Sequence, residues 1–181
     1  PRATIVWGTA LVLVALPFVV SVPLSTEILI WTIFGLGFNL LLGYTGVLSF
    51  GHAAYFGLGA YASGLALKYW QVDILTALAA GVGAPLLLAC FIGALAIRRR
   101  GVYFAMISLA FGQMLYFIAL SPLKEVTRGE DGLTHIMQSV NLFSVSLDKP
   151  KHLYYFVLVI TVVMLYLTWR ILQSPFGKML Q

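Results

Sequence analysis

Long apolar stretches alternate with short polar connections along the chain. Four stretches approach or exceed the roughly 20 apolar residues that a helix needs to cross a bilayer. Two shorter stretches flank a glycine-rich segment. Because the apolar runs are continuous rather than alternating, they favour helices over the strands of an outer-membrane barrel. The pattern predicts membrane-spanning helices at Ile5–Val22, Ile28–Leu42, Ala53–Leu67, Leu75–Ile97, Val102–Leu120 and Leu153–Leu172.

This order of elements predicts an all-α fold, a polytopic transmembrane helical bundle with about six spans and one Gly-interrupted helix pair. We expect residues 1–181 to be a single transmembrane domain, the N-terminal part of a longer chain, with 121–152 as an outer loop. Cytoplasmic loops carry an excess of basic residues. The tight Arg98–Arg100 turn therefore favours an orientation with both ends of the fragment in the cytoplasm. The four tryptophans lie near the ends of these predicted spans, where we expect them to be interfacial anchors: Trp7, Trp31, Trp70 and Trp169.

Composition supports the membrane assignment and excludes other classes. Of 181 residues, 61% are hydrophobic and only 9% are charged, whereas a soluble domain carries about 25% charged residues. Apart from Arg170, every charged residue falls outside the predicted spans. The net charge of +5 does not indicate nucleic-acid binding, because the basic residues lie between apolar runs and form no stripe with aromatics. We expect a lipid bilayer as partner, and no nucleic acid.

The segment between the two shorter spans is the most informative part of the chain. Ile28–Leu42 has 15 residues, which is short for a full crossing, and Gly43, Gly46 and Gly51 follow it. Glycine permits backbone angles that other residues resist. Backbone groups freed from a helix at membrane depth must be buried in protein or face a wet cavity. Short, glycine-interrupted spans are the best sequence indicator of a transporter site, so we predict a solute pathway here.

Polar side chains surround this break. We expect Ser49 to cap a helix that begins near Phe50, with its hydroxyl accepting a hydrogen bond from the amide of His52. The positive end of that helix favours an anion such as an amino-acid carboxylate. The alternative is a local turn at the cytoplasmic face with these side chains satisfied nearby. The candidate pathway residues are Asn39, Gly43, Tyr44, Gly46, Ser49, Gly51 and His52.

Small residues recur at four-residue spacing in the helix that follows. The pairs are Ala53/Gly57, Gly59/Ser63 and Ala60/Gly64. Small residues at this interval let membrane helices approach closely. The spacing does not separate a dimer interface from packing inside the chain.

Four ordered motifs resemble those of a known family. They begin with Gly43-Tyr-Thr-Gly-Val-Leu-Ser-Phe-Gly-His52, which continues to Gly57-x-Gly-Ala-Tyr61. The others are Arg99-Arg-Gly-Val-Tyr-Phe-Ala-Met-Ile-Ser-Leu-Ala-Phe111, Thr127-Arg-Gly-Glu-Asp-Gly-Leu133 and Ser174-Pro-Phe-Gly-Lys178. Together they resemble the bacterial branched-chain amino-acid ABC transporter permeases, most closely the M-type subunit, over residues 28–181.

The resemblance implies a permease domain in the bacterial inner membrane with several partners. In this family two permease subunits form the pathway, two cytoplasmic ATPase subunits drive it, and an external solute-binding protein delivers Leu, Ile or Val. ATP is therefore used by the partners, and no cofactor is expected in this chain. Related members carry urea or short amides, which leaves those substrates as an alternative.

The resemblance also assigns roles to two further sets of residues. Thr127, Arg128, Glu130 and Asp131 fall in the outer loop, where the binding protein would dock. Ser174, Phe176, Gly177 and Lys178 fall near the segment that couples to the ATPase. The family usually has Thr-Gly-Gly where this chain has Thr127-Arg128-Gly129, so Arg128 would be strained if its position needs a positive φ.

Two other functions compete with an ATP-driven permease. An ion-coupled secondary transporter often places Asp or Glu within its spans, and the central portions of the predicted spans have neither. A membrane enzyme would need catalytic or metal-ligating residues, but His52, His135 and His152 are scattered without metal-ligand spacing. We therefore expect no enzyme, no catalytic residues and no metal site.

Overall fold

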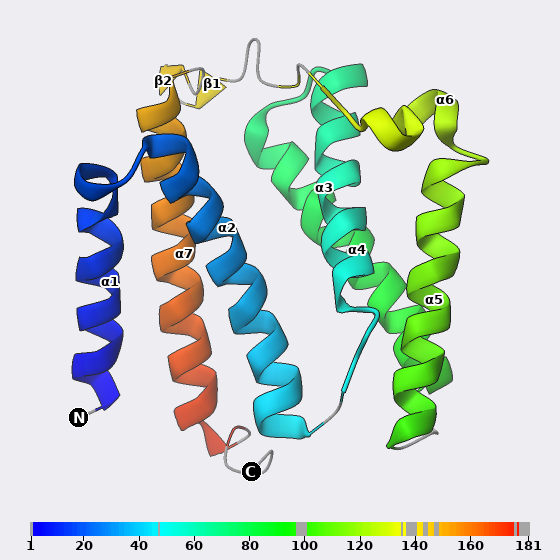
Figure 1. Ribbon diagram of the computed structural model, residues 1–181, viewed down its shortest axis with the longest axis horizontal. Helices are drawn as coiled ribbons and strands as arrows, with labels where there is room; N and C mark the ends of the chain where they lie inside the picture. The colour runs from blue at the N-terminus through cyan, green and yellow to red at the C-terminus, as the bar shows by residue number, and fades with distance from the viewer. Residues whose placement is uncertain are drawn as a thin grey trace. The chain divides into compact units, whose positions relative to one another are not determined.

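Helices make up nearly all of the computed structural model (Figure 1). It describes residues 2–46, 48–96, 101–134, 136, 141–142, 145–146, 149–175 and 177. Six helices of 18 residues or more follow one another in the predicted order: α1 (Arg2–Val19), α2 (Val22–Asn39), α3 (His52–Tyr69), α4 (Ile74–Ala96), α5 (Val102–Leu120) and α7 (Pro150–Gln173). The shorter elements are η1 (Leu40–Tyr44), α6 (Lys124–Thr127), η2 (Gly129–Asp131), β1 (Asn141–Leu142) and β2 (Val145–Ser146).

The expected all-α membrane bundle with a glycine-interrupted helix pair is confirmed. Within the described residues, four helical segments are both long and apolar enough to cross a membrane: Val22–Tyr44, Ile74–Ala94, Val102–Leu120 and Pro150–Gln173. Along them, large apolar side chains are exposed, such as Leu87 (74%), Tyr103 (71%) and Val159 (62%). Apolar exposure on this scale is unstable in water and suits lipid. The count of six spans is thus approximate, and the chain is a multi-pass membrane protein.

The helices form two compact units. Unit 1 consists of Pro1–Gly46 and Ser146–Gln181, and unit 2 of Val47–Val145. In unit 1, α2 packs along α7, and the start of α1 lies at the same end as the end of α7 (Figure 1). In unit 2, α3, α4 and α5 run in alternating directions. A single domain over residues 1–181 stays a prediction, as does the side of the membrane on which each end lies.

The start of the second span was predicted wrongly. Helix α2 begins at Val22, six residues before the expected Ile28, and the span that includes it has 23 residues. Ser25 and Thr26 enter the helix because their hydroxyls donate to the carbonyls of Ser21 (3.1 Å) and Val22 (2.9 Å), which removes the cost of burying them.

Two further expectations change with this boundary. Glu27, expected outside the spans, lies within α2. Trp31 is the tenth residue of the span, so it lies near the middle of the span and not at an interface.

A proline organises the core of unit 1. Leu13, Leu29, Tyr154 and Leu158 form this core, and Tyr154 is 1% exposed. Pro17 lies inside α1 and has no N–H, so it cannot donate to the carbonyl of Leu13 one turn earlier. The Tyr154 hydroxyl of α7 donates to that carbonyl instead. The side chain of one helix thus replaces the backbone bond that the proline removes from another.

Close helix packing organises unit 2. Glycines of α3 and α4 meet: a Cβ added to Gly59 would lie 2.7 Å from the carbonyl oxygen of Gly81, and one added to Gly81 would lie 3.1 Å from Cβ of Ser63. Pro85 lacks the N–H that would bond to the Gly81 carbonyl. This oxygen therefore faces the α-hydrogen of Gly59. The Gly59/Ser63 pair is a packing contact inside the chain, whereas Gly57 meets nothing within 4 Å.

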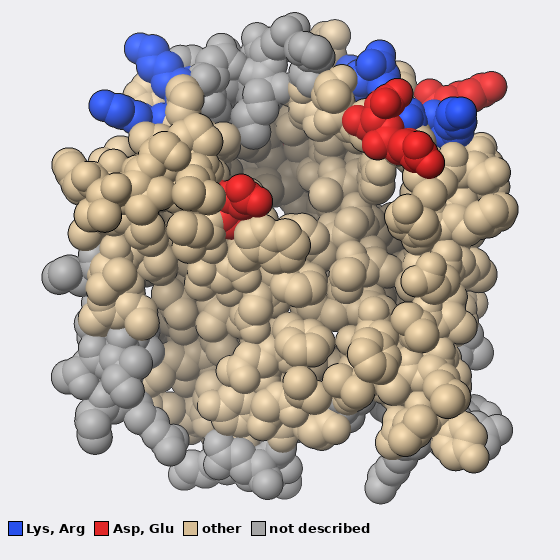
Figure 2. Space-filling view, in the orientation of Figure 1, with Lys and Arg blue, Asp and Glu red and all other residues tan. Residues whose placement is uncertain are grey.

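Charged side chains concentrate beyond the helix ends. In unit 2 those of Lys124, Arg128, Glu130 and Asp131 lie around α6 and η2, and the visible helical face below them is uncharged (Figure 2). This distribution fits a helical body in lipid with its connection in water. The Arg98–Arg100 turn and part of the predicted outer loop 121–152 lie outside the described residues.

Candidate functional site

The predicted break begins at the end of α2, in unit 1. The last turn of the span, Leu40–Tyr44, is a π-helix, a wider turn that often occurs at functional sites. The Asn39 amide oxygen lies over Gly43, where an added Cβ would be 2.6 Å from it. The Thr45 hydroxyl donates to the carbonyl of Leu41, and Gly46 then leaves the helix with φ at 64°. Glycine is favoured at that angle because a Cβ would crowd the backbone.

The start of α3, in unit 2, differs from the prediction in one respect. The helix begins at His52, and its N-cap residue is Gly51, which has no side chain to cap it. Ser49 is buried, at 5% exposure, two residues before the N-cap. The expected cap by Ser49 is therefore wrong. The hydroxyl of Ser108 on α5 lies at this end of α3 and accepts a hydrogen bond from the backbone N–H of Phe50 at 3.1 Å.

Gly51 is required where the break meets α5. A Cβ on Gly51 would lie 2.6 Å from the carbonyl oxygen of Ser108, and one on Gly112 would lie 3.5 Å from Cα of Gly51. Gly51 has φ at −83°, which any residue can adopt, so the demand for glycine is steric. The Ser108 hydroxyl also donates to the carbonyl of Ala105 at 2.8 Å. The first turn of α3 is therefore fixed to α5 by contact and by hydrogen bonding.

Sequence reasoning did not identify Ser108, although a signal was present. It is the only serine or threonine within the apolar run Val102–Leu120, and polar residues at membrane depth usually serve a function. Its partner Phe50 lies 58 positions away, and spacing along the chain could not reveal that pairing.

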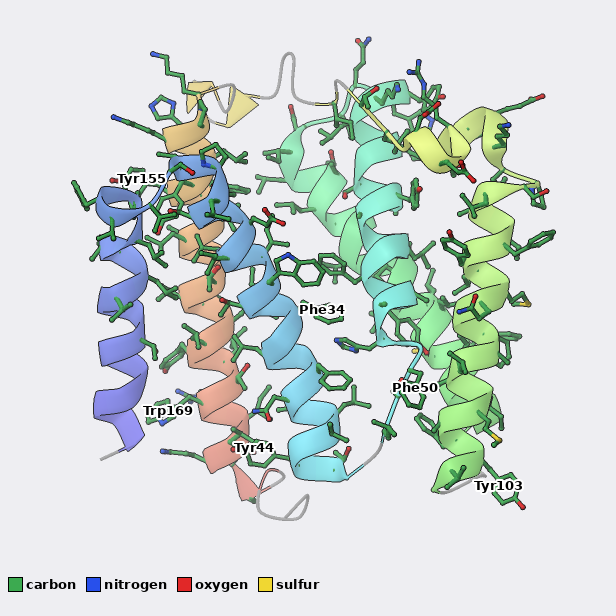
Figure 3. All side chains as sticks on the ribbon, viewed as in Figure 1. Phe34, Tyr44, Phe50, Tyr103, Tyr155 and Trp169 are labelled. Atoms are coloured by element: carbon green, nitrogen blue, oxygen red, sulfur yellow. The ribbon has the colours of Figure 1, made fainter. Side chains whose placement is uncertain are left out.

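The structure places the seven candidate pathway residues at two helix ends. Asn39, Gly43, Tyr44 and Gly46 belong to the end of α2, where Figure 3 shows Tyr44 at the base of the helix. The other three, Ser49, Gly51 and His52, belong to the start of α3 beside Phe50 (Figure 3). Direct proximity is found for Asn39 with Gly43. These groups are amides, hydroxyls, an imidazole and backbone N–H groups, all of which are hydrogen-bond donors or acceptors.

The predicted outer loop has the strained geometry that the sequence suggested. Arg128 has φ at 62° and ψ at 15°, the left-handed region that costs a non-glycine residue about 1–2 kcal/mol. Glu130 and Asp131 are exposed with it. Thr127, by contrast, is 3% exposed, and its hydroxyl donates to the carbonyls of Ala119 (2.6 Å) and Leu123 (2.9 Å). Thr127 thus stabilises the loop from inside, and its assignment as a binding-protein contact stays a prediction.

The motif at the end of α7 reverses the chain. The Ser174 hydroxyl donates to the carbonyl of Ile171 at 2.6 Å and accepts from the N–H of Gly177 at 3.2 Å. With Pro175 next in the chain, this is the arrangement of a helix start: a serine cap, a proline in the first position and a bonded amide in the third. Gly177 is buried against the backbone of Ile171 and Leu172. Phe176 and Lys178 lie outside the described residues.

Comparison with known proteins shows the family. A family model described as branched-chain amino acid transport system / permease component matches residues 20–181. The high-affinity branched-chain amino acid transport system permease protein LivM of Salmonella typhimurium is 28% identical over 91% of this chain, and the protein of the same name from Escherichia coli is 27% identical over the same share. No solved structure matches.

The matches cover most of this chain but only part of each relative. The alignments cover 44% of each LivM protein, so the chain spans less than half the length of these relatives. The family is a transport component and not an enzyme. Because the family model matches most of the chain, the chain belongs to the branched-chain amino acid transport system / permease component family.

Proposed function

We propose that this chain lines the translocation pathway of an ATP-driven importer of branched-chain amino acids in the bacterial inner membrane. It acts with a second permease subunit, two cytoplasmic ATPase subunits and an external solute-binding protein. The observation that supports this proposal best is the break at residues 45–51, where a 23-residue span ends in a π-turn and a new helix begins at His52. The family match supports branched-chain amino acids as the substrate class.

The break suits a solute pathway because some of its backbone N–H and C=O groups lie outside regular α-helical hydrogen bonding. A π-turn, a left-handed glycine and a helix start leave backbone polar groups outside regular α-helical pairing. In a membrane protein, such groups lie inside protein or beside water. The N-terminal end of α3 carries partial positive charge, and we propose that it attracts the carboxylate of the amino acid during passage.

The remaining motifs suit contacts at the two membrane faces. Arg128, Glu130 and Asp131 present charge of both signs on an exposed loop, and we assign them to the binding-protein side. Ser174 and Gly177 fix a sharp helix restart at the end of α7. We assign that restart to the ATPase side, together with Phe176 and Lys178.

Reconstitution of the full-length protein tests this function. Uptake of leucine into proteoliposomes should require the binding protein, the ATPase subunits and ATP together. Gly51→Ala should lower uptake at least tenfold at equal amounts of inserted protein, because its Cβ meets the Ser108 backbone at 2.6 Å and displaces the start of α3. The matched control is Gly57→Ala, six residues further along the chain in α3, where nothing lies within 4 Å.

The outcomes separate this function from its rivals. Uptake that survives without ATP and follows an ion gradient would support a secondary transporter. Preferential uptake of urea or short amides would support the permease function but would replace branched-chain amino acids as the proposed substrate. Equal loss of insertion and uptake in Gly51→Ala would make the break a structural turn.

A further inference from the structure

A carboxylate and an aromatic pair share one face of α2. Glu27, Trp31 and Phe34 follow one another at spacings of four and three, which places them along one side of a helix. The rings of Trp31 and Phe34 meet edge to face with centroids 5.7 Å apart. Trp31 is 57% exposed, and Glu27 is exposed as well.

This face is not the one that packs in unit 1. Ser25 and Leu29 are fully buried on the side of α2 that lies along α7. Glu27 is two positions from each, roughly 200° around the helix. In Figure 3, Phe34 projects from α2 on the side away from α7. The exposed Glu27 and Trp31 therefore lie on a side of α2 other than the one that packs along α7.

A charge within a span requires an explanation. Glu27 lies five residues after Val22, roughly 7–8 Å into the span at 1.5 Å per residue. Within the described part of the chain no ion pair reaches its carboxylate. Ionisable residues inside membrane spans are costly and mark solute or ion pathways, where they meet a cation or water. Charge complementarity thus points to a cationic group as the occupant.

The neighbouring aromatic rings favour an ammonium group over a metal ion as that cation. An ammonium group binds to the face of tryptophan or phenylalanine by cation–π attraction and to a carboxylate by a charge-assisted hydrogen bond. Glu27 and Trp31 together offer both. A bare metal ion would call for several oxygen ligands, whereas the neighbours at this spacing are aromatic.

We propose that Glu27 and Trp31 form a binding site for the α-ammonium group of the transported amino acid. This inference rests on the proposed function, which it deepens by naming the group on α2 that recognises the substrate. Phe34 holds the Trp31 ring through the edge-to-face contact. Glu27 and Trp31 are the sixth and tenth of the 23 residues of the span, so the ammonium group is engaged in the half of the span that begins at Val22.

Binding to the full-length permease in its complex with the ATPase subunits tests the site. Tryptophans are labelled with fluorine in lipid nanodiscs, and the Trp31 resonance is identified by its loss in Trp31→Phe. The probes are leucine, 3-methylbutylammonium, which keeps the ammonium group without the carboxylate, and 4-methylpentanoate, which keeps the carboxylate without the ammonium group. Leucine and 3-methylbutylammonium should shift the resonance, and 4-methylpentanoate should leave it unchanged.

The variants complete the test. Glu27→Gln should raise the half-saturating concentration of 3-methylbutylammonium about tenfold, the effect of losing a charged hydrogen-bond partner. Glu130→Gln, which removes an exposed carboxylate from the outer loop, should change nothing. The inference is overturned by an equal response to 4-methylpentanoate, by unchanged titration of Glu27→Gln, or by no response to leucine. If Glu27→Gln also keeps full ATP-driven leucine uptake, the proposed permease function is retained and only the proposed ammonium site is rejected.

Discussion

The pairing of Tyr154 with a proline-freed carbonyl yields the sharpest prediction about stability. Pro17 leaves the carbonyl of Leu13 without its helical donor, and the Tyr154 hydroxyl supplies the hydrogen bond. Tyr154→Phe keeps the packing of the ring and removes that donor. The buried carbonyl is then unsatisfied, which costs about 1–3 kcal/mol in soluble proteins and about 0.6–1.7 kcal/mol between membrane helices. We expect a loss of about 1–1.5 kcal/mol.

A second substitution identifies the cause. Pro17→Ala restores a backbone N–H one turn from Leu13, so the carbonyl regains a partner within α1. In this background Tyr154→Phe should cost less than about 0.5 kcal/mol, because the hydroxyl is no longer the only donor. The cycle therefore predicts a coupling free energy of about 1 kcal/mol between positions 17 and 154.

Reversible unfolding of the full-length protein in mixed micelles measures these differences. Tyr155→Phe is the matched control, because Tyr155 is the next residue on α7, its ring packs against that of Tyr154 at 5.6 Å, and it is 48% exposed. It should change the free energy of unfolding by less than about 0.5 kcal/mol. The reasoning is refuted if Tyr154→Phe costs the same with proline and with alanine at position 17.

Two further substitutions test other parts of the structure. Gly59→Ala should destabilise the protein by about 1–3 kcal/mol through overpacking against the Gly81 carbonyl, whereas Gly83→Ala, with nothing within 4 Å, should not; equal unfolding free energies for the two variants would rule out the close α3–α4 contact. Arg128→Gly should raise the thermal midpoint by relieving about 1 kcal/mol of left-handed strain, and a lower midpoint would mean that the arginine side chain stabilises the loop.

Much of the architecture could be predicted because membrane helices can be recognised in a sequence by their long apolar runs. The span Val102–Leu120 was predicted with the bounds that the structure gives, and its limits are marked by Gly101 and by polar residues after Leu120. The break near Gly46 was predicted because several glycines interrupt an apolar region. Arg128 was singled out for strain because a glycine is usual at its position, and its φ of 62° confirms the positive angle.

Errors arose where a polar side chain is satisfied by a partner that hydropathy does not show. The predicted second span began at Ile28 and so left out Ser25 and Thr26, yet each hydroxyl bonds to the carbonyl four residues earlier. Ser49 was assigned as a cap because it lies near the helix start, whereas the hydroxyl that meets the Phe50 amide comes from Ser108 on another helix. Such pairings depend on tertiary packing, and a single sequence contains no direct record of them.

Water access to the break tests the central claim most directly. Single cysteines at Asn39, Thr45 and Phe50, which are exposed in the structure, are placed in a Cys90→Ala background of the full-length transporter and treated with a membrane-impermeant thiol reagent from each side. The account predicts that all three react, and that the reactive side changes when the ATPase subunits are trapped with ATP. Cysteines that stay unreactive from both sides in every state, in a transporter that still takes up leucine, would contradict it.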